Sequence, residues 1–198
     1  MTEGSGAWQP IALLLLAAGR SRRFGRDKLA MPIARRPLCQ HTALAFAGQS
    51  LARRIAGVGE SDHGLADLGF ECLRVPSGEA ALSASIATGM RSVAEDPDLA
   101  GVLIALGDMP LVASSDVRQL IDAFDGSAVA SAIAGRPQPP ALFGRRHFPA
   151  LQVLEGDAGA RDLLRSARHV EAEPATLCDV DTPEDFTRLS ALLGQAKS

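Results

Sequence analysis

The sequence has few cysteines, no long apolar stretch and no excess of basic residues. Cys39, Cys72 and Cys178 are far apart and form no C-x-x-C pair, which argues against a disulfide framework and against a zinc site. No apolar run approaches the roughly 20 residues that a membrane-spanning helix needs. The net charge of -3 argues against a nucleic-acid-binding face spread over the whole surface. We therefore expect a cytoplasmic protein that binds neither membrane nor nucleic acid.

The apolar residues 11–18 resemble the core of a secretory signal peptide, but the charged residues lie on the wrong side of it. A signal peptide has basic residues before its apolar region, whereas here only Glu3 is charged ahead of Ile11 and the arginines follow. The glycines that come next, Gly19 and Gly25, fit neither the G-x-G-x-x-G dinucleotide fingerprint nor the Gly-Lys-Ser/Thr ending of a phosphate loop. We expect a strand of the folded protein here rather than a signal peptide, followed by a glycine turn that matches neither motif.

Two continuous apolar runs, residues 11–17 and 101–106, are typical of strands buried on both faces of a parallel sheet. Similar but weaker segments alternate with helical patterns, which predicts an α/β sandwich with a mostly parallel sheet. The 198 residues suit one domain, over residues 8–194, with disordered tails at 1–7 and 195–198. The weaker strands are expected at residues 54–58, 71–75, 128–134 and 141–143, and helices at 40–51, 80–93, 115–124, 148–154 and 158–167.

Ligands of an open parallel sheet bind beyond the carboxyl ends of its strands, and here both strong strands end in distinctive loops. A glycine turn after the first strand would expose backbone N–H groups, and basic side chains surround it, so this loop suits a polyphosphate. A solvated basic loop that only keeps the protein soluble is the alternative. The second strand ends at Asp108, where a carboxylate can hold Mg²⁺ together with substrate phosphates. The basic residues are Arg20, Arg22, Arg23, Arg26 and Lys28.

A second group of carboxylates lies near the C-terminus. In an extended backbone, Asp179 and Asp181 would point to the same side, so both could face one metal ion. The following Thr182-Pro183-Glu184-Asp185 predicts a helix start with an N-cap threonine, proline at the first helical position and acids in the first turn. Capping explains Thr182 and Asp185, but it does not explain the two aspartates before them.

The stretch LAAGRSRRFGRDKL resembles the L-A-A-G-x-S-x-R-x-G-x-x-K signature of the MobA-like nucleotidyltransferases. The segments GDMP, FGRRHFPALQVLEGDAGARDLL and DVDTPEDF resemble the same family, in particular its molybdenum cofactor cytidylyltransferase branch. The resemblance implies a Rossmann-like three-layer α/β/α sandwich of the nucleotide-diphospho-sugar transferase type. The positions that match the signature are Leu16, Ala17, Ala18, Gly19, Ser21, Arg23, Gly25 and Lys28.

The resemblance also implies roles for single residues. Mg²⁺ would be held at Asp108 and Asp181, with Asp179 as a further candidate. Triphosphate contacts would come from Gly19, Arg23 and Lys28, and Arg20 is included among the nucleotide contacts. The candidate catalytic residues are Lys28, Arg23 and Asp108, and we expect Lys28 to be exposed in its loop. The segment SASIATG resembles the family's helix start near the base, which adds Ser83, Ser85 and Gly89 to the nucleotide candidates, although helix capping explains the serines equally well.

On this resemblance we expect transfer of a nucleoside monophosphate, from CTP rather than GTP, to the terminal phosphate of molybdopterin, with release of pyrophosphate. Residues 156–161 are candidates for the acceptor side, in an open cleft between the glycine turn and residues 140–161. Such a reaction needs no general base, so we interpret the four scattered histidines, His41, His63, His147 and His169, as surface or locally hydrogen-bonded residues. The alternatives are a guanylyltransferase on the same cofactor, a nucleotidyltransferase for a sugar phosphate or another phosphate ester, and a non-catalytic accessory protein that delivers molybdopterin to a molybdenum hydroxylase.

Overall fold

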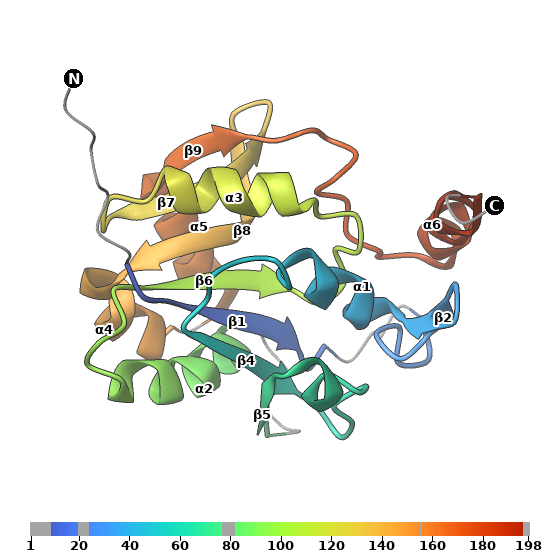
Figure 1. Ribbon diagram of the computed structural model, residues 1–198, viewed down its shortest axis with the longest axis horizontal. Coiled ribbons are helices and arrows are strands. Elements are labelled where there is room, and N and C mark those ends of the chain that lie inside the picture. Colours follow the sequence, from blue (N-terminus) through green and yellow to red (C-terminus); the bar gives the residue numbers. More distant parts are fainter. Residues whose placement is uncertain (1–8, 20–23, 77–81, 155, 196–198) are drawn as a thin grey trace.

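A seven-stranded sheet with helices on both faces forms the centre of the protein (Figure 1). The computed structural model describes residues 9–19, 24–76, 82–154 and 156–195. The strand order is β5-β4-β1-β6-β8-β7-β9. Strand β8 is antiparallel to both of its neighbours, and the other pairs are parallel. The predicted α/β class and the mostly parallel sheet are therefore confirmed. The strands are β1 (Ile11–Ala17), β4 (Arg53–Val58), β5 (Glu71–Arg74), β6 (Gly101–Leu106), β7 (Ala128–Ile133), β8 (Arg136–Gly144) and β9 (Arg168–Glu171).

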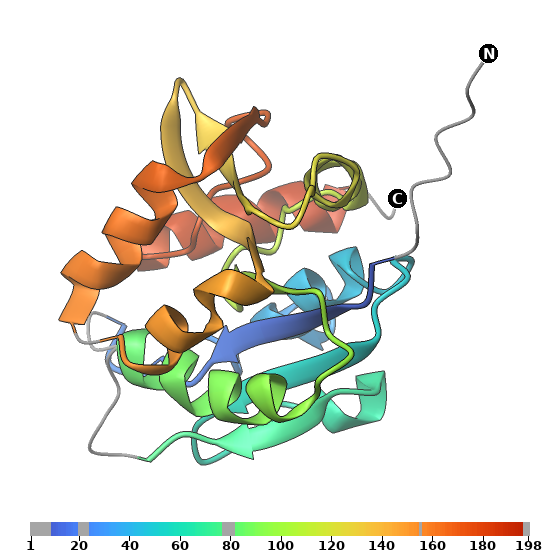
Figure 2. The same cartoon turned by 90° about the vertical axis from the view of Figure 1, so that its left-hand side faces the viewer.

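The helices cover the two faces of this sheet (Figures 1 and 2). Side chains of α1, α3 and α6 join the apolar core on one face, and those of α2, α4 and α5 join the core on the other. Among the described helices, none is both long and apolar enough to cross a bilayer. The helices are α1 (Leu38–Ala45), α2 (Leu82–Glu95), α3 (Ser114–Asp122), α4 (Phe148–Gln152), α5 (Gly156–Ser166) and α6 (Pro183–Gln195), with short 3-10 turns at Ala66–Leu68 and Arg145–His147.

Strand β1 shows why the central strands are wholly apolar. Its odd-numbered residues pack into the core on the α1 face, and its even-numbered residues pack into the core on the α2 face. Because successive side chains of a strand point to opposite faces, a strand covered on both sides needs apolar residues at every position. This pattern is visible in the sequence, and the boundaries of β1 and β6 agree with the predicted ones to the residue.

Four predictions need correction. Helix α1 ends at Ala45 rather than at residue 51, since the chain turns before Gly48 and Ser50, two poor helix formers. Strand β8 is longer than predicted, because its three prolines argue against a strand in the sequence. The exposed edge strand β9 and the short hairpin of β2 (Pro32–Ile33) and β3 (Arg36–Pro37) were missed, as they carry no buried apolar pattern. Helix α6 continues to Gln195, where a tail was expected, and the other tail residues, 1–7 and 196–198, lie outside the described part of the chain.

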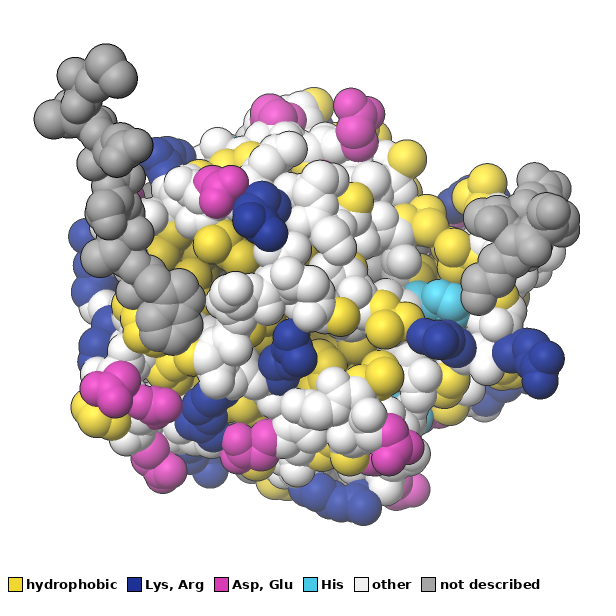
Figure 3. Space-filling view, in the orientation of Figure 1, with side chains coloured by type: hydrophobic (Ala, Val, Ile, Leu, Met, Phe, Trp, Pro, Cys, Tyr) yellow, Lys and Arg dark blue, Asp and Glu magenta, His cyan; other side chains and the backbone are white. Residues whose placement is uncertain are grey.

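The charge on the surface is mixed. On the face drawn in Figure 3, lysine and arginine side chains are interspersed with aspartate and glutamate. No single sign of charge dominates this face, which agrees with the net charge of -3 for the whole chain.

Gly144 ends β8 where the chain passes close to Gly126. A Cβ at Gly144 would overlap the backbone carbonyl of Gly126, which cannot rotate away as a side chain can. We expect Gly144→Ala to lower the free energy of unfolding by about 2 to 3 kcal/mol, measured by urea denaturation. Gly48→Ala is the matched control: this glycine is exposed with open space around it, so we expect a change within about 0.5 kcal/mol. Equal changes in the two variants would contradict the close approach.

Candidate active site

The ends of β1 and β6 meet at the carboxyl edge of the sheet. The N–H of Gly107, which follows β6, donates a hydrogen bond to Leu16 O of β1 at 2.9 Å. A Cβ at Gly107 would lie 3.1 Å from that same oxygen, so glycine permits the close approach. Thr42 of α1 donates from its buried hydroxyl to Gly107 O at 3.1 Å and braces the turn from the other side. Asp108, the next residue, is therefore held beside the end of β1, where a ligand of such a sheet is expected.

Lys28 lies between two aspartates at this edge. Its Nζ is 2.7 Å from Asp108 Oδ2 and 3.3 Å from Asp181 Oδ1, and it donates to Val180 O at 2.7 Å. The side chain is only 11% exposed, so the expectation of an exposed loop lysine was wrong. The reason is tertiary: residues 180 and 181 fold over the lysine from a part of the chain more than 150 residues away.

The electrostatics of this group favour a charged lysine. Burial by itself lowers the pKa of Lys28, but the carboxylates of Asp108 and Asp181 outweigh it and raise the pKa above its usual value. Desolvation, and after it the negative charges of Asp181 and Asp108, raises the pKa of Asp179. Asp108 and Asp181 therefore contact the ammonium directly, and Asp179 is close enough to interact with all three groups electrostatically.

The segment that carries Asp179 and Asp181 is tied down at both ends. Val180 N donates to Asp108 O at 3.0 Å. Asp185 Oδ2 accepts from Thr182 N at 3.0 Å, and Thr182 Oγ1 in turn accepts from Asp185 N at 3.2 Å, a reciprocal cap at the start of α6. The capping role predicted for these two residues is confirmed. Because Asp181 directly precedes the capped Thr182, the cap helps to fix Asp181 next to Lys28.

An aromatic contact connects α6 to the basic loop. The rings of Phe24 and Phe186 meet edge to face with their centroids 6.4 Å apart. Phe186 lies in the first turn of α6, and Phe24 precedes Lys28 by four residues. The C-terminal segment therefore contacts the basic loop through both a charged and an apolar interaction.

The structure places the remaining predicted nucleotide contacts in different environments. The side chains of Leu16 and Ala17 are buried in the core, so only their backbone can face a ligand. Gly19 and Gly25 are exposed, and Gly25 has a φ of +65°, which favours glycine. Ala18 is half-buried. The predictions for Arg20, Ser21, Arg22 and Arg23 fall on residues outside the described part of the chain.

The candidates on α2 lie at two depths. Ser83 and Ser85 are buried in the first turns of the helix. Gly89 lies further along, where an added Cβ would overlap the side chain of Leu14. Its small size thus allows α2 to pack closely on β1, which accounts for this glycine without a ligand.

Asp108 has the features of a cation ligand. Its Oδ1 is buried and has no hydrogen-bond partner among the described residues, while Oδ2 contacts Lys28. The described residues contain no group of three or more His, Cys, Asp or Glu side chains arranged around a metal position. Mg²⁺ commonly takes one or two carboxylates and completes its shell with substrate phosphates and water. Asp108, with the half-exposed Asp181 nearby, fits such a site.

Of the two interpretations of His63, surface or locally hydrogen-bonded, the structure excludes the first, because the residue is buried and its backbone is hydrogen-bonded to Ser61 and Gln40. Its side chain is 4% exposed, and Nε2 lies 3.3 Å from Asp27 Oδ2. Neither His63 nor its partner was proposed for the site, since no spacing in the sequence connects two residues 36 positions apart.

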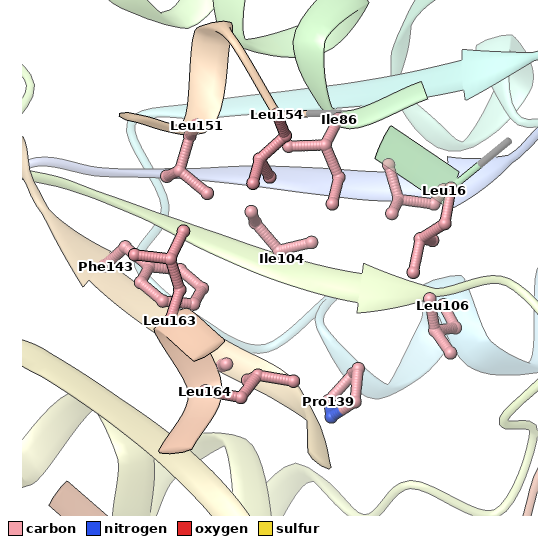
Figure 4. A pocket seen from close by; sticks show the side chains of 12 residues that line it. Leu16, Ile86, Ile104, Leu106, Pro139, Phe143, Leu151, Leu154, Leu163 and Leu164 are labelled. Carbon is pink, nitrogen blue, oxygen red and sulfur yellow. The ribbon is translucent and has the colours of Figure 1, made fainter. Parts of the chain in front are cut away.

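An apolar cavity of about 40 Å³ opens between the sheet and helices α2, α4 and α5 (Figure 4). It reaches the ends of β1 and β6 at Leu16 and Leu106, next to the loops that carry Lys28 and Asp108. The open cleft that was predicted between the glycine turn and residues 140–161 would include this cavity, and it stays a prediction. The side chains around the cavity are Leu16, Leu82, Ile86, Ile104, Leu106, Pro139, Ala141, Phe143, Leu151, Leu154, Leu163 and Leu164.

Several known proteins are similar to this chain in sequence and fold. The MobA-like NTP transferase domain matches residues 13–173. The purine catabolism protein PucB of Bacillus subtilis is 29% identical over 191 residues, which cover 87% of this chain and 92% of PucB. A homologue of Rv0371c from Mycobacterium sp. strain JC1 has a TM-score of 0.81 at 26% identity, over 94% of this chain and 98% of the other. Rv0371c of Mycobacterium tuberculosis in complex with manganese has a TM-score of 0.77 at 26% identity, over 92% and 99%.

The family match extends over most of the chain. It includes the glycine turn, Lys28 and Asp108, and ends before Asp181. The two structural alignments cover nearly the whole length of each neighbour, and they include more of this chain than the family match does. The chain therefore belongs to the MobA-like NTP transferase family, a family of nucleotidyltransferases.

Proposed function

We propose that the protein transfers a nucleoside monophosphate from a nucleoside triphosphate, CTP by preference, to the terminal phosphate of a molybdopterin-type acceptor. The observation that carries the proposal is the ammonium of Lys28, which is paired with both Asp108 and Asp181 at the carboxyl edge of the sheet. A fixed positive charge and adjacent carboxylates are what a site for polyphosphate chemistry needs. Pure binding of a cofactor by an accessory protein would not require this arrangement.

The reaction follows from the charges. An oxygen of the acceptor phosphate attacks the α-phosphorus of the triphosphate and forms a new P–O bond. The bond between that phosphorus and the oxygen bridging to the β-phosphate breaks, and pyrophosphate leaves with the electron pair. The acceptor is a phosphate monoester with a second pKa of about 6, so it is largely ionised at neutral pH and no general base is needed. Lys28 stabilises the negative charge that develops on the leaving pyrophosphate, and Arg23 would assist it.

Asp108 and Asp181 are the residues that would hold Mg²⁺, with Asp179 beside them. The orphaned Asp108 Oδ1 supports this assignment. The ion would neutralise phosphate charge on both reactants when bound. Gly19 and Gly25 would offer backbone N–H groups to the phosphates, since both are exposed and Gly25 precedes Lys28 by three residues.

The choice of CTP rests on the start of α2. In a parallel βα unit the helix begins at the carboxyl edge of the sheet, so the first turns of α2 lie on the side where the nucleotide would bind. Ser83 and Ser85 are buried there, and we expect this region to hydrogen-bond the edge of a pyrimidine and to crowd a purine. Discrimination that depends on unpaired polar groups is larger than discrimination by size.

The choice of a molybdopterin-type acceptor rests on the likeness of residues 143–164 and 179–186 to the cytidylyltransferase branch. Residues 156–161 would lie on the acceptor side, next to the cavity lined by α4 and α5. The product would pass to a molybdenum hydroxylase apoenzyme. A guanylyltransferase on the same acceptor, or a transferase for another phosphate ester, would use the same charged group with a different pocket.

The decisive experiment incubates the protein with Mg²⁺, molybdenum cofactor and each of the four nucleoside triphosphates, and measures pyrophosphate release. We expect CTP to be used at least about tenfold better than GTP. A preference for GTP would assign the protein to guanylyl transfer. Absence of release with every nucleotide, over several phosphate acceptors, would favour the accessory-protein alternative. Thermal unfolding gives a parallel test, since CTP at about a hundredfold excess over its Kd should stabilise the protein by about 2.7 kcal/mol.

A further inference from the structure

His63 adopts an unusual backbone conformation in the loop between β4 and β5. Its φ is +53° and that of the following Gly64 is +73°. Residues other than glycine rarely adopt positive φ, although histidine does so more readily than branched residues. Hydrogen bonds hold this conformation: His63 N donates to Ser61 Oγ at 3.1 Å, and His63 O accepts from Gln40 Nε2 at 2.7 Å. Strained backbone that is fixed in this way is frequently associated with a functional requirement.

The conformation directs the buried imidazole at Asp27. His63 Nε2 lies 3.3 Å from Asp27 Oδ2, and the other oxygen, Oδ1, accepts a hydrogen bond from Leu29 N at 3.0 Å. The carboxylate of Asp27 is thus held from both sides. Asp27 and Leu29 are the immediate neighbours of Lys28. The hydrogen bond between them therefore closes a turn around the backbone of the lysine.

The turn continues with further hydrogen bonds around the same residue. Met31 N donates to Lys28 O at 3.1 Å, and Cys39 N of α1 donates to Leu29 O at 3.3 Å. The backbone of Lys28 is therefore anchored in the turn, while its side chain must reach three partners with a flexible four-carbon stem. A misplacement of about 1 Å in such a group can lower a rate by about 10²-fold.

We propose that His63 is a positioning residue for Lys28: it fixes Asp27, and Asp27 fixes the turn from which the ammonium reaches Asp108 and Asp181. The proposal rests on the proposed function, because it assigns His63 to the step that Lys28 assists. His63 does not touch the reacting atoms. Its effect is expected in turnover rather than in nucleotide binding.

His63→Asn is the sharpest test, because asparagine also tolerates a positive φ but its side chain is too short to reach Asp27. We expect kcat for pyrophosphate release to fall about tenfold, with the KM for the nucleotide nearly unchanged. In a Lys28→Ala background the same substitution should have no further effect on kcat. His169→Asn, at an exposed position on β9, is the matched control and should leave kcat unchanged. An equal loss from His63→Asn in both backgrounds would overturn the proposal, because a general structural defect would act without Lys28.

A second measurement does not depend on the reaction. An amine-acylating reagent, with mass spectrometry of the labelled peptides, reports how accessible Lys28 is in nucleotide-free protein. We expect faster labelling of Lys28 in His63→Asn and in Asp27→Asn, a substitution at a half-exposed side chain that retains the acceptor for Leu29 N. An unchanged labelling rate in both variants would overturn the positioning role. If the wild-type protein released no pyrophosphate from any nucleotide, the proposed function would fail and the labelling result would still decide the role of His63.

Discussion

Replacement of Lys28 by alanine is expected to lower kcat for pyrophosphate release by about 10²- to 10³-fold, the usual effect of removing one fixed charge donor at a developing anion. The ammonium is already in place, held by Asp108 and by the carbonyl oxygen of Val180. Arg26→Ala is the matched control, because this neighbouring basic residue is exposed and should cost little activity. Turnover that survives in Lys28→Ala would remove the lysine from the mechanism. Equal losses in both variants would show that the loop acts through diffuse charge.

The same substitution should also affect stability, because the side chain of Lys28 is only 11% exposed and is paired with Asp108. Its removal leaves the carboxylate of Asp108, which is 19% exposed, without its cationic partner, and we expect a loss of about 1 to 3 kcal/mol in the free energy of unfolding. The pKa of Lys28 in the folded protein lies above its ordinary value of 10.5, so its contribution is complete below that pH and is lost only as the pH rises through the folded pKa. The difference between wild type and variant should therefore stay constant from about pH 6 to about pH 9. A difference that declines within this range would contradict the pairing.

Asp108→Asn is expected to lower divalent-cation-dependent activity by at least about 10²-fold while leaving a folded protein. The amide keeps the shape of the side chain but loses the charge that attracts both the cation and Lys28. The measurements are pyrophosphate release and the rise in thermal unfolding temperature when Mg²⁺ is added with nucleotide. The cation-induced rise should disappear in the variant. Retention of that rise would show that Asp108 is not a ligand.

The neighbouring aspartates provide the comparison. Asp181→Asn should resemble Asp108→Asn, since Asp181 also contacts Lys28. Asp179→Asn should be milder in activity. It should also be neutral or slightly stabilising, because desolvation and the adjacent carboxylates raise the pKa of Asp179 and its charged form is unfavourable in the folded protein. Greater damage from Asp179→Asn than from Asp181→Asn would assign the second ligand to Asp179.

The elements that could be read from the sequence are those whose burial leaves a local pattern. Strands β1 and β6 are covered on both faces and are apolar throughout, and Thr182 with Asp185 marks the start of α6 by the residues of a single turn. Strand β8 was read only in part, because its prolines favour other conformations locally and its pairing with β6 and β7 overrides that preference. The exposed strand β9 has no pattern to read, because its environment is the sheet edge and solvent.

Local patterns were enough to predict the α/β class and the two central strands. They also gave the basic loop, Asp108 at a strand end and Asp181 before α6 as candidate site residues. The packing of distant segments places the largely buried Lys28 side chain between those carboxylates and directs His63 at Asp27. The physical reason is the range of the interactions. A strand face or a helix cap is set by residues a few positions apart, whereas the environment of Lys28 is set by sheet pairing and by hydrogen bonds to residues more than 150 positions away, which no local pattern encodes.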